Sequence, residues 1–284
     1  MKKLLIALII IIGFGLISAK KQKDKVFSIK MIENSLSKVG KNVSAKLYAS
    51  KYETSNFLYL TFLNDLKNNN QIDKYNQAKI DTSKWEDGKN YRKPLREYYH
   101  KHSAFENFPV VNISYEGAIL FCEWLSEKYN SAPKRKYQKV VFRLPTKKEW
   151  EKAAKGGLRG VSYPWGGPNL TNKQGCVSCN YYGLGANSIH FNKETKKYEV
   201  ITDLYFSESN ALTCSVDNYS PNGYGLYNMS GNVKEMIAQK GISKGGGYLS
   251  TGYDVRIQSE DTYNTAANDL GFRYFIEILE GKEH

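Results

Sequence analysis

The sequence predicts one α+β domain that is rich in loops, and three observations support this fold class. Tyrosine and glycine are unusually frequent among the 284 residues, with 22 and 23 copies. Tyrosine suits half-buried positions where its hydroxyl finds a partner, and glycine permits irregular backbone. Capping residues mark several helix starts, and short apolar runs are typical of strands. This combination does not suit a helical bundle.

Three helices begin at capping signals. Ser114 precedes one helix, and residues 54–56 precede another. Thr146 and Glu149 form a capping box, in which each side chain accepts a hydrogen bond from a free backbone amide. The expected inner faces are apolar at helical spacing. They carry Phe57, Leu60, Leu63 and Leu66; Ala118, Phe121, Cys122 and Leu125; and Trp150, Ala153 and Ala154.

Several short strands are expected, because apolar residues alternate or run together between turn residues. Residues 166–220, rich in Asn, Gly, Ser and Tyr, are expected to be irregular. The chain contains no internal repeat, so one domain is the simplest organisation. The expected strands are residues 46–53, 108–113, 140–145, 243–249 and 269–278.

The N-terminus has the pattern of an export segment. Two lysines precede an apolar run from Leu4 to Ile17, and Ser18-Ala19 offers small residues for cleavage. Residues 1–19 are therefore expected to be a signal peptide or a retained N-terminal anchor. Residues 20–32 are expected to be a polar linker and residues 33–284 the folded domain. Either alternative places the domain outside the cytoplasm, in the periplasm or cell envelope, with membrane contact only through the N-terminal segment.

The net charge of +13 does not indicate nucleic-acid binding. Six lysines and one aspartate within residues 1–25 account for much of it. The remaining lysines are scattered, mostly beside acidic residues, and no arginine-rich run with interleaved aromatic residues occurs. A lysine-rich solvated surface accounts for the charge, and no nucleic-acid partner is expected.

The cysteines and histidines do not form a recognisable metal motif. Cys176 and Cys179 are a Cys-x-x-Cys pair without the second pair that a zinc site needs. In an exported chain, two of Cys176, Cys179 and Cys214 can form a disulfide, and the sequence leaves the pairing open. His100 and His102 lack a third ligand at useful spacing.

Residues 222–235 form an oxygen-rich segment with three glycines. Asn228, Asn232 and Glu235 bring amide and carboxylate oxygens within eight residues, and calcium prefers such ligands. The alternative is a glycine-rich turn with solvated side chains. Spacing alone favours that turn, because the pattern is not that of an EF-hand.

Seven segments recur in this order in one known family. The chain resembles the formylglycine-generating enzyme family, also called the sulfatase-modifying factor domain family, over essentially all of its length after the export segment. Each motif is weak alone, and the ordered set is specific. The segments are 51–56 (KYETSN), 109–118 (PVVNISYEGA), 142–157 (FRLPTKKEWEKAAKGG), 163–166 (YPWG), 221–235 (PNGYGLYNMSGNVKE), 244–248 (KGGGY) and 270–273 (LGFR).

The resemblance implies a C-type-lectin-like formylglycine-generating-enzyme fold, low in regular secondary structure and often calcium-bound. It assigns calcium ligands to four positions and a second site that begins near two others. The later ligands of that second site fall in a segment that cannot be aligned. The first set is Asn228, Gly231, Val233 and Glu235, and the second begins near Asn180 and Tyr181.

The catalytic chemistry of the family does not carry over. Its active members oxidise a substrate cysteine using two cysteines just after the Gly-Gly-x-Tyr/Trp motif, and these thiolates bind copper(I). Ser250 and Val255 occupy the two positions in this chain. Because neither side chain can bind copper(I) or undergo thiol redox chemistry, copper is not expected. The histidine-rich domain of the family's non-haem iron enzymes is also missing.

Three functions follow from the resemblance. The first is a non-catalytic, calcium-stabilised binding or scaffold module with an envelope protein partner. Residues 81–85 and 94–105 resemble lipoproteins of gliding-motility and type IX secretion assemblies, although the lipid-bearing cysteine is lacking. The second is a formylglycine-generating-type oxidoreductase or another enzyme with altered chemistry. The third is ligand display by residues 248–268, with Tyr248, Tyr253 and Tyr263 as rigid contacts. The groove residues expected for the enzyme are Tyr248, Ser250, Thr251, Tyr253, Asp254 and Arg256.

Overall fold

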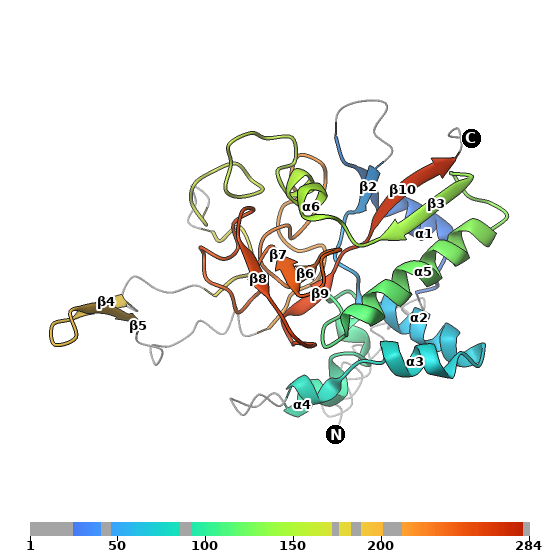
Figure 1. The fold of residues 1–284 in the computed structure, drawn as a ribbon, viewed down its shortest axis with the longest axis horizontal. Helices are drawn as coiled ribbons and strands as arrows, with labels where there is room; N and C mark the ends of the chain where they lie inside the picture. Colours follow the sequence, from blue (N-terminus) through green and yellow to red (C-terminus); the bar gives the residue numbers. More distant parts are fainter. Residues whose placement is uncertain are drawn as a thin grey trace, which may run out of the picture.

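The computed structural model describes residues 25–40, 47–85, 93–171, 176–182, 189–200 and 212–280. Within these ranges, most helices lie on one side of the molecule together with one group of strands, and a second group of short strands lies with loops towards the other side (Figure 1). No described helix has the length and apolar character needed to cross a membrane. Residues 1–19, expected to be a signal peptide or anchor, lie outside the described residues.

The helices fall mainly in the first half of the chain. They include α5, which packs against α2 and α3 and against one strand of the first sheet described below. The α-helices are α1 Ile29–Asn34, α2 Asn56–Asn68, α3 Ile72–Ala78, α4 Lys93–Tyr98, α5 Tyr115–Ser131 and α6 Lys147–Ala154, and the 3-10 helices are η1 Thr82–Trp85 and η2 Ser103–Phe105.

Two four-stranded sheets are the β part of the fold. The first has the order β1-β2-β10-β3 with antiparallel neighbours. The second has the order β8-β7-β6-β9, in which β6 and β9 run parallel. A hairpin of β4 and β5 projects away from the rest (Figure 1). The strands are β1 Leu36–Lys38, β2 Leu47–Ser50, β3 Lys139–Arg143, β4 Ile189–Asn192, β5 Lys197–Val200, β6 Lys234–Met236, β7 Ile242–Lys244, β8 Glu260–Thr262, β9 Leu270–Phe272 and β10 Phe275–Glu280.

An aromatic core joins α2 and α5 to the C-terminal strands. The rings of Tyr59 and Phe121 are stacked with centroids 5.8 Å apart, and Phe272 meets both edge-on. All three side chains are fully buried. Such ring pairs add to the stability that burial of apolar surface provides.

The capping signals are confirmed. Ser55 and Ser114 cap α2 and α5, and Thr146 and Glu149 make both hydrogen bonds of the capping box at α6. These features were predictable because all of their partners lie within three residues of one another.

Three expected strands differ in the structure. Residues 243–249 are a strand only as far as Lys244, where β7 ends. Residues 269–278 are two strands rather than one, because the chain is interrupted at Arg273 and the halves β9 and β10 join different sheets. Residues 108–113 contribute only an isolated bridge between Pro109 and Ser55.

The segment 20–32, expected to be a polar linker, contains folded residues. Helix α1 begins at Ile29 within this segment, and Ile32 is fully buried. The Phe27 ring lies 5.4 Å from that of Trp124. Apolar side chains in a polar stretch therefore hold this segment on the domain.

Candidate functional site

A buried ion pair lies at the end of the oxygen-rich segment. Strand β6 directs Glu235 toward Arg273, whose guanidinium donates to its carboxylate at 2.8 Å. Trp150 donates to the same carboxylate through Nε1 at 2.7 Å. Glu235 is 1% exposed and Arg273 0%. A buried charge is tolerated when it is paired and fully hydrogen-bonded, as it is at this site.

The remaining donors of Arg273 bind backbone carbonyls from separate segments. Its Nη1 donates to the carbonyl oxygens of Ser50 and Lys51 at 2.9 and 2.7 Å, and Nη2 donates to that of Tyr227 at 2.7 Å. Arg273 therefore connects the end of β2, the segment before residue 228 and strand β6. Its role is structural.

A second buried carboxyl group, that of Glu53, lies above this pair. Its Oε2 accepts hydrogen bonds from Nδ2 of Asn228 at 3.0 Å and of Asn232 at 2.9 Å. Its Oε1 has no partner among the described residues. Burial, and then the nearby charge of Glu235, raise the pKa of Glu53 to about 8.

The backbone of the oxygen-rich segment is tightly turned. Asn228, Gly231 and Asn232 have φ values of 51°, 77° and 65°, in the left-handed region. The Asn232 amide donates to the carbonyl of Asn180 at 2.7 Å. A Cβ on Gly231 would lie 2.3 Å from that same oxygen, so only glycine fits. The structure thus brings together the regions of both expected calcium sites.

The oxygen ligands at this site are chemically suited to calcium, but their one negative charge is already paired. Asn228, Gly231, Val233 and Glu235 together offer amide, backbone and carboxylate oxygens, which calcium prefers. The negative charge of Glu235 is already paired with Arg273. A calcium ion held by these four residues would share that carboxylate with a guanidinium. Weak binding, as in extracellular calcium modules, is the expectation.

The loop at the two cysteine positions is stabilised by its own turn. Ser250 Oγ accepts from the Gly247 amide at 2.9 Å, and Thr251 donates to Asp254 at 2.7 Å. Val255 is fully buried. Ser250 therefore acts as a turn residue and Val255 as a core residue.

The other expected groove residues separate into buried and exposed positions. Tyr248 is fully buried, whereas Tyr253 is 67% exposed. The Arg256 guanidinium lies 3.4 Å from the centroid of the Tyr253 ring, a cation–π contact. Tyr253, Asp254 and Arg256 thus share one turn at the surface, whereas Tyr248 is buried.

Thiols lie close to this loop although none lies in it. Cys179 packs in one apolar cluster with Val255 and Tyr163. Cys214 contacts Asn232 Oδ1 through Sγ at 3.3 Å. Burial raises the pKa of both thiols to about 12, so the reactive thiolate is scarce at neutral pH. Among the described residues, Cys122, Cys179 and Cys214 form no disulfide with one another.

The two histidines have structural partners. His100 is buried, its Nδ1 lies 2.9 Å from Asn56 Oδ1, and burial lowers its pKa to about 3. His102 accepts a hydrogen bond from the Ala104 amide. In the described part of the chain, no three His, Cys, Asp or Glu side chains are grouped to hold a metal ion.

Comparison with known proteins decides the family. Residues 19–278 match the family described as "Sulfatase-modifying factor enzyme 1-like domain". The chain belongs to this family. The resemblance carried by the seven sequence segments is thereby confirmed.

Members of the sulfatase-modifying factor family that match the chain include both active and inactive proteins. The formylglycine-generating enzyme of Thermomonospora curvata is 36% identical over 132 residues, which cover 46% of this chain and 33% of the relative. The inactive C-alpha-formylglycine-generating enzyme 2 of Bos taurus is 29% identical over 185 residues, which cover 58% and 48%. The chain thus spans a third to a half of these curated relatives.

Solved structures confirm the α+β fold with little regular secondary structure. CarF superposes with a TM-score of 0.53 at 20% identity, covering 86% of this chain and 93% of CarF. PvdO from Pseudomonas aeruginosa gives 0.54 at 17% identity, covering 85% and 90%. At these identities the likeness concerns the fold alone.

Sequence reasoning gave no role to Glu53 or Arg273, although both lie within quoted motifs. An acidic residue between Tyr52 and Thr54 resembles any polar strand end, and an arginine after Leu-Gly-Phe resembles a surface charge. Their partners Asn232 and Glu235 are far away in sequence. The one local signal in the sequence was the position of Arg273, a charged residue between the apolar segments that form β9 and β10.

Glu53 should make stability depend on pH. Its ordinary pKa of 4.5 is raised to about 8 in the folded protein. Between these values the folded protein keeps a proton that the unfolded chain has released. The unfolding free energy should therefore fall as pH rises, by up to about 1.4 kcal/mol per pH unit. Urea unfolding at pH 5 to 8, with a chelator present, measures this slope.

The variant Glu53→Gln cannot titrate and should flatten the slope. The exposed carboxyl group of Glu97 on α4 supplies the control, and Glu97→Gln should leave the slope unchanged. Equal slopes for the wild type and Glu53→Gln would contradict the assignment.

Proposed function

We propose that the chain is an exported, non-catalytic binding or scaffold module of the bacterial cell envelope, stabilised by calcium. The observation that carries this proposal is the loop at residues 247–256. One expected cysteine position holds a serine used in a turn and the other a buried valine. A relative in the same family that is named as inactive supports a fold that is retained without the catalytic activity. An assembly of the gliding-motility or secretion type is the proposed setting.

The exposed turn of this loop is the proposed contact for an envelope protein partner. Tyr253 is 67% exposed and Leu249 39%, although both are large apolar side chains. Arg256 stacks on the Tyr253 ring and orders it. Rigid tyrosine and arginine side chains are the residue types that dominate protein interfaces.

Replacement of Tyr253 tests the partner contact. Tyr253→Ala should weaken binding to the envelope partner about thirtyfold and so reduce covalent cross-linking, because truncation of a hot-spot tyrosine costs about 2 kcal/mol. The matched control is Tyr98→Ala, which removes a 52% exposed tyrosine from α4. Yields are measured by mass spectrometry after cross-linking in intact cells. Equal loss in both variants, or loss in neither, would argue against this surface.

Calcium should raise the melting temperature. With a dissociation constant of about 0.1–1 mM, calcium at 5 mM should stabilise the domain by about 1–2 kcal/mol, or roughly 3–6 °C. Differential scanning calorimetry with calcium, magnesium and a chelator measures this shift. Magnesium is the control, because it demands tighter octahedral geometry. Identical midpoints in all three would remove calcium from the proposal.

A second candidate function is a formylglycine-generating-type oxidoreductase with altered chemistry. One observation favours it: Cys179 lies in the same apolar cluster as Val255, next to one expected cysteine position. Its burial and high pKa argue against redox activity at neutral pH.

Oxidation of a cysteine peptide separates the two candidates. We expect no aldehyde when the protein is incubated with a sulfatase-derived cysteine peptide, copper and oxygen, because neither loop position offers a thiolate. Mass spectrometry with a carbonyl-specific probe gives the readout. Aldehyde formed by the wild type and lost in Cys179→Ser would establish the oxidoreductase and overturn the scaffold proposal.

A further inference from the structure

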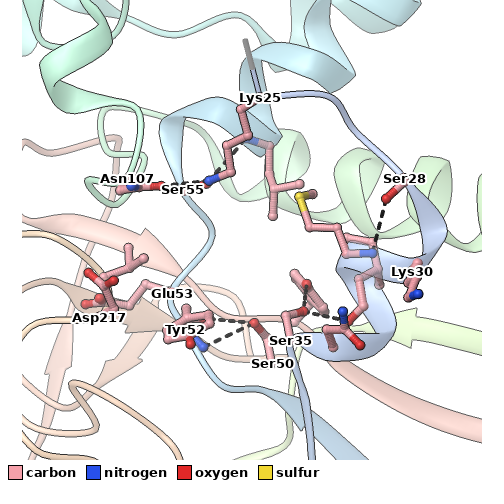
Figure 2. Close-up of a pocket in the computed structure, with 16 residues that line it drawn as sticks. Lys25, Ser28, Lys30, Ser35, Ser50, Tyr52, Glu53, Ser55, Asn107 and Asp217 are labelled. Atoms are coloured by element: carbon pink, nitrogen blue, oxygen red, sulfur yellow. Dashed lines mark hydrogen bonds between the residues drawn. The ribbon is translucent and has the colours of Figure 1, made fainter. Parts of the chain in front are cut away.

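A cavity of about 590 Å³ lies on a part of the molecule that neither function uses. It is bounded by helix α1, the end of β2 and the start of α2 (Figure 2). No residue of the loop 247–256 lines it. Its volume falls within the usual range of small-molecule sites.

Acidic side chains and a basic side chain lie on opposite sides of this cavity. Figure 2 shows Asp217 and Glu53 on one side, Lys30 on the other, and Lys25 beside Asn107. The Lys25 ammonium already donates to Asn107 Oδ1 at 2.7 Å. Glu53 is 1% exposed and its Oε1 lacks a partner among the described residues. Because Glu53 keeps its proton below about pH 8, Asp217 is the side chain that offers a charged acceptor to a cationic group, and Lys30 can bind an anionic group.

The rest of the lining combines apolar side chains with hydroxyl groups. A ligand that carried one charge alone would leave the opposite side of the cavity unpaired, and a purely apolar ligand would leave both sides unpaired. The lining therefore matches a ligand with a positive end, a negative end and an aliphatic body. The apolar lining residues are Met31, Ile32, Leu58 and Val216.

We propose that this cavity binds a short zwitterionic peptide with an aliphatic side chain. The peptide's ammonium group lies at Asp217, its carboxylate lies at Lys30, and its side chain packs on the apolar lining residues. This site is separate from the exposed turn at Tyr253 and does not depend on the partner or calcium proposals.

Calorimetric titration with the dipeptide Leu-Leu tests the site in the full-length exported protein. N-acetyl-Leu-Leu lacks the ammonium group and Leu-Leu-amide lacks the carboxylate. Each blocked peptide should bind about tenfold more weakly than Leu-Leu, because a charge-assisted hydrogen bond is lost.

Two variants assign each end of the ligand. The variant Asp217→Asn should bind Leu-Leu about tenfold more weakly than the wild type does. It should bind Leu-Leu and N-acetyl-Leu-Leu with equal affinity. The variant Lys30→Gln should also bind Leu-Leu about tenfold more weakly, and it should bind Leu-Leu and Leu-Leu-amide with equal affinity. Asp73→Asn and Lys74→Gln, at exposed positions of α3 outside the cavity, should bind like the wild type.

Three results would overturn the proposal, once circular dichroism shows that every variant is folded. The first is no binding of Leu-Leu at millimolar concentration. The second is equal binding of all three peptides to the wild type. The third is an effect of the α3 control variants equal to that of the cavity variants.

Discussion

The structure depends on one buried cation. Arg273 has no access to solvent, so every donor of its guanidinium must find a partner within the protein. It finds them in Glu235 and in carbonyl groups at Lys51 and Tyr227. Meeting this requirement interrupts the C-terminal strand and divides it between two sheets. Removing one partner of such a pair would leave an uncompensated buried charge, which commonly costs about 3–5 kcal/mol.

Close backbone contacts are a second constraint and explain several glycines of the family motifs. A Cβ on Gly223 would lie 2.4 Å from the carbonyl oxygen of Gly156, and one on Gly271 would lie 2.6 Å from that of Val110. Only glycine allows such approaches. These motif residues therefore specify the frame, whatever chemistry the loop carries. A chain can keep these glycines and belong to the family whatever residues stand at positions 250 and 255.

Local features were predictable from the sequence, and long-range ones were not. The caps at Ser114 and Thr146 were predictable because each involves residues within one turn. The family motifs gave the fold class, which the solved structures confirm. The partners of Glu53 are 175 and 179 residues away, and no local pattern shows that Asn228 turns its amide toward this carboxyl group. The calcium ligands stay a prediction.

Glu53 connects the cavity with the frame of the loop at residues 247–256. It lines the cavity and also accepts hydrogen bonds from Asn232, whose carbonyl in turn accepts from the Tyr248 amide at 2.9 Å. Tyr248 begins the loop that carries Tyr253. Substitution of Glu53 therefore disturbs both regions together, whereas Asp217 and Tyr253 each belong to one. A contiguous row of contacts does not by itself transmit a signal between sites, since coupling requires an element with two discrete states. Glu53, Asn232 and Tyr248 are all buried and are joined to one another by hydrogen bonds. They therefore act as a rigid support between two surfaces that can bind independently.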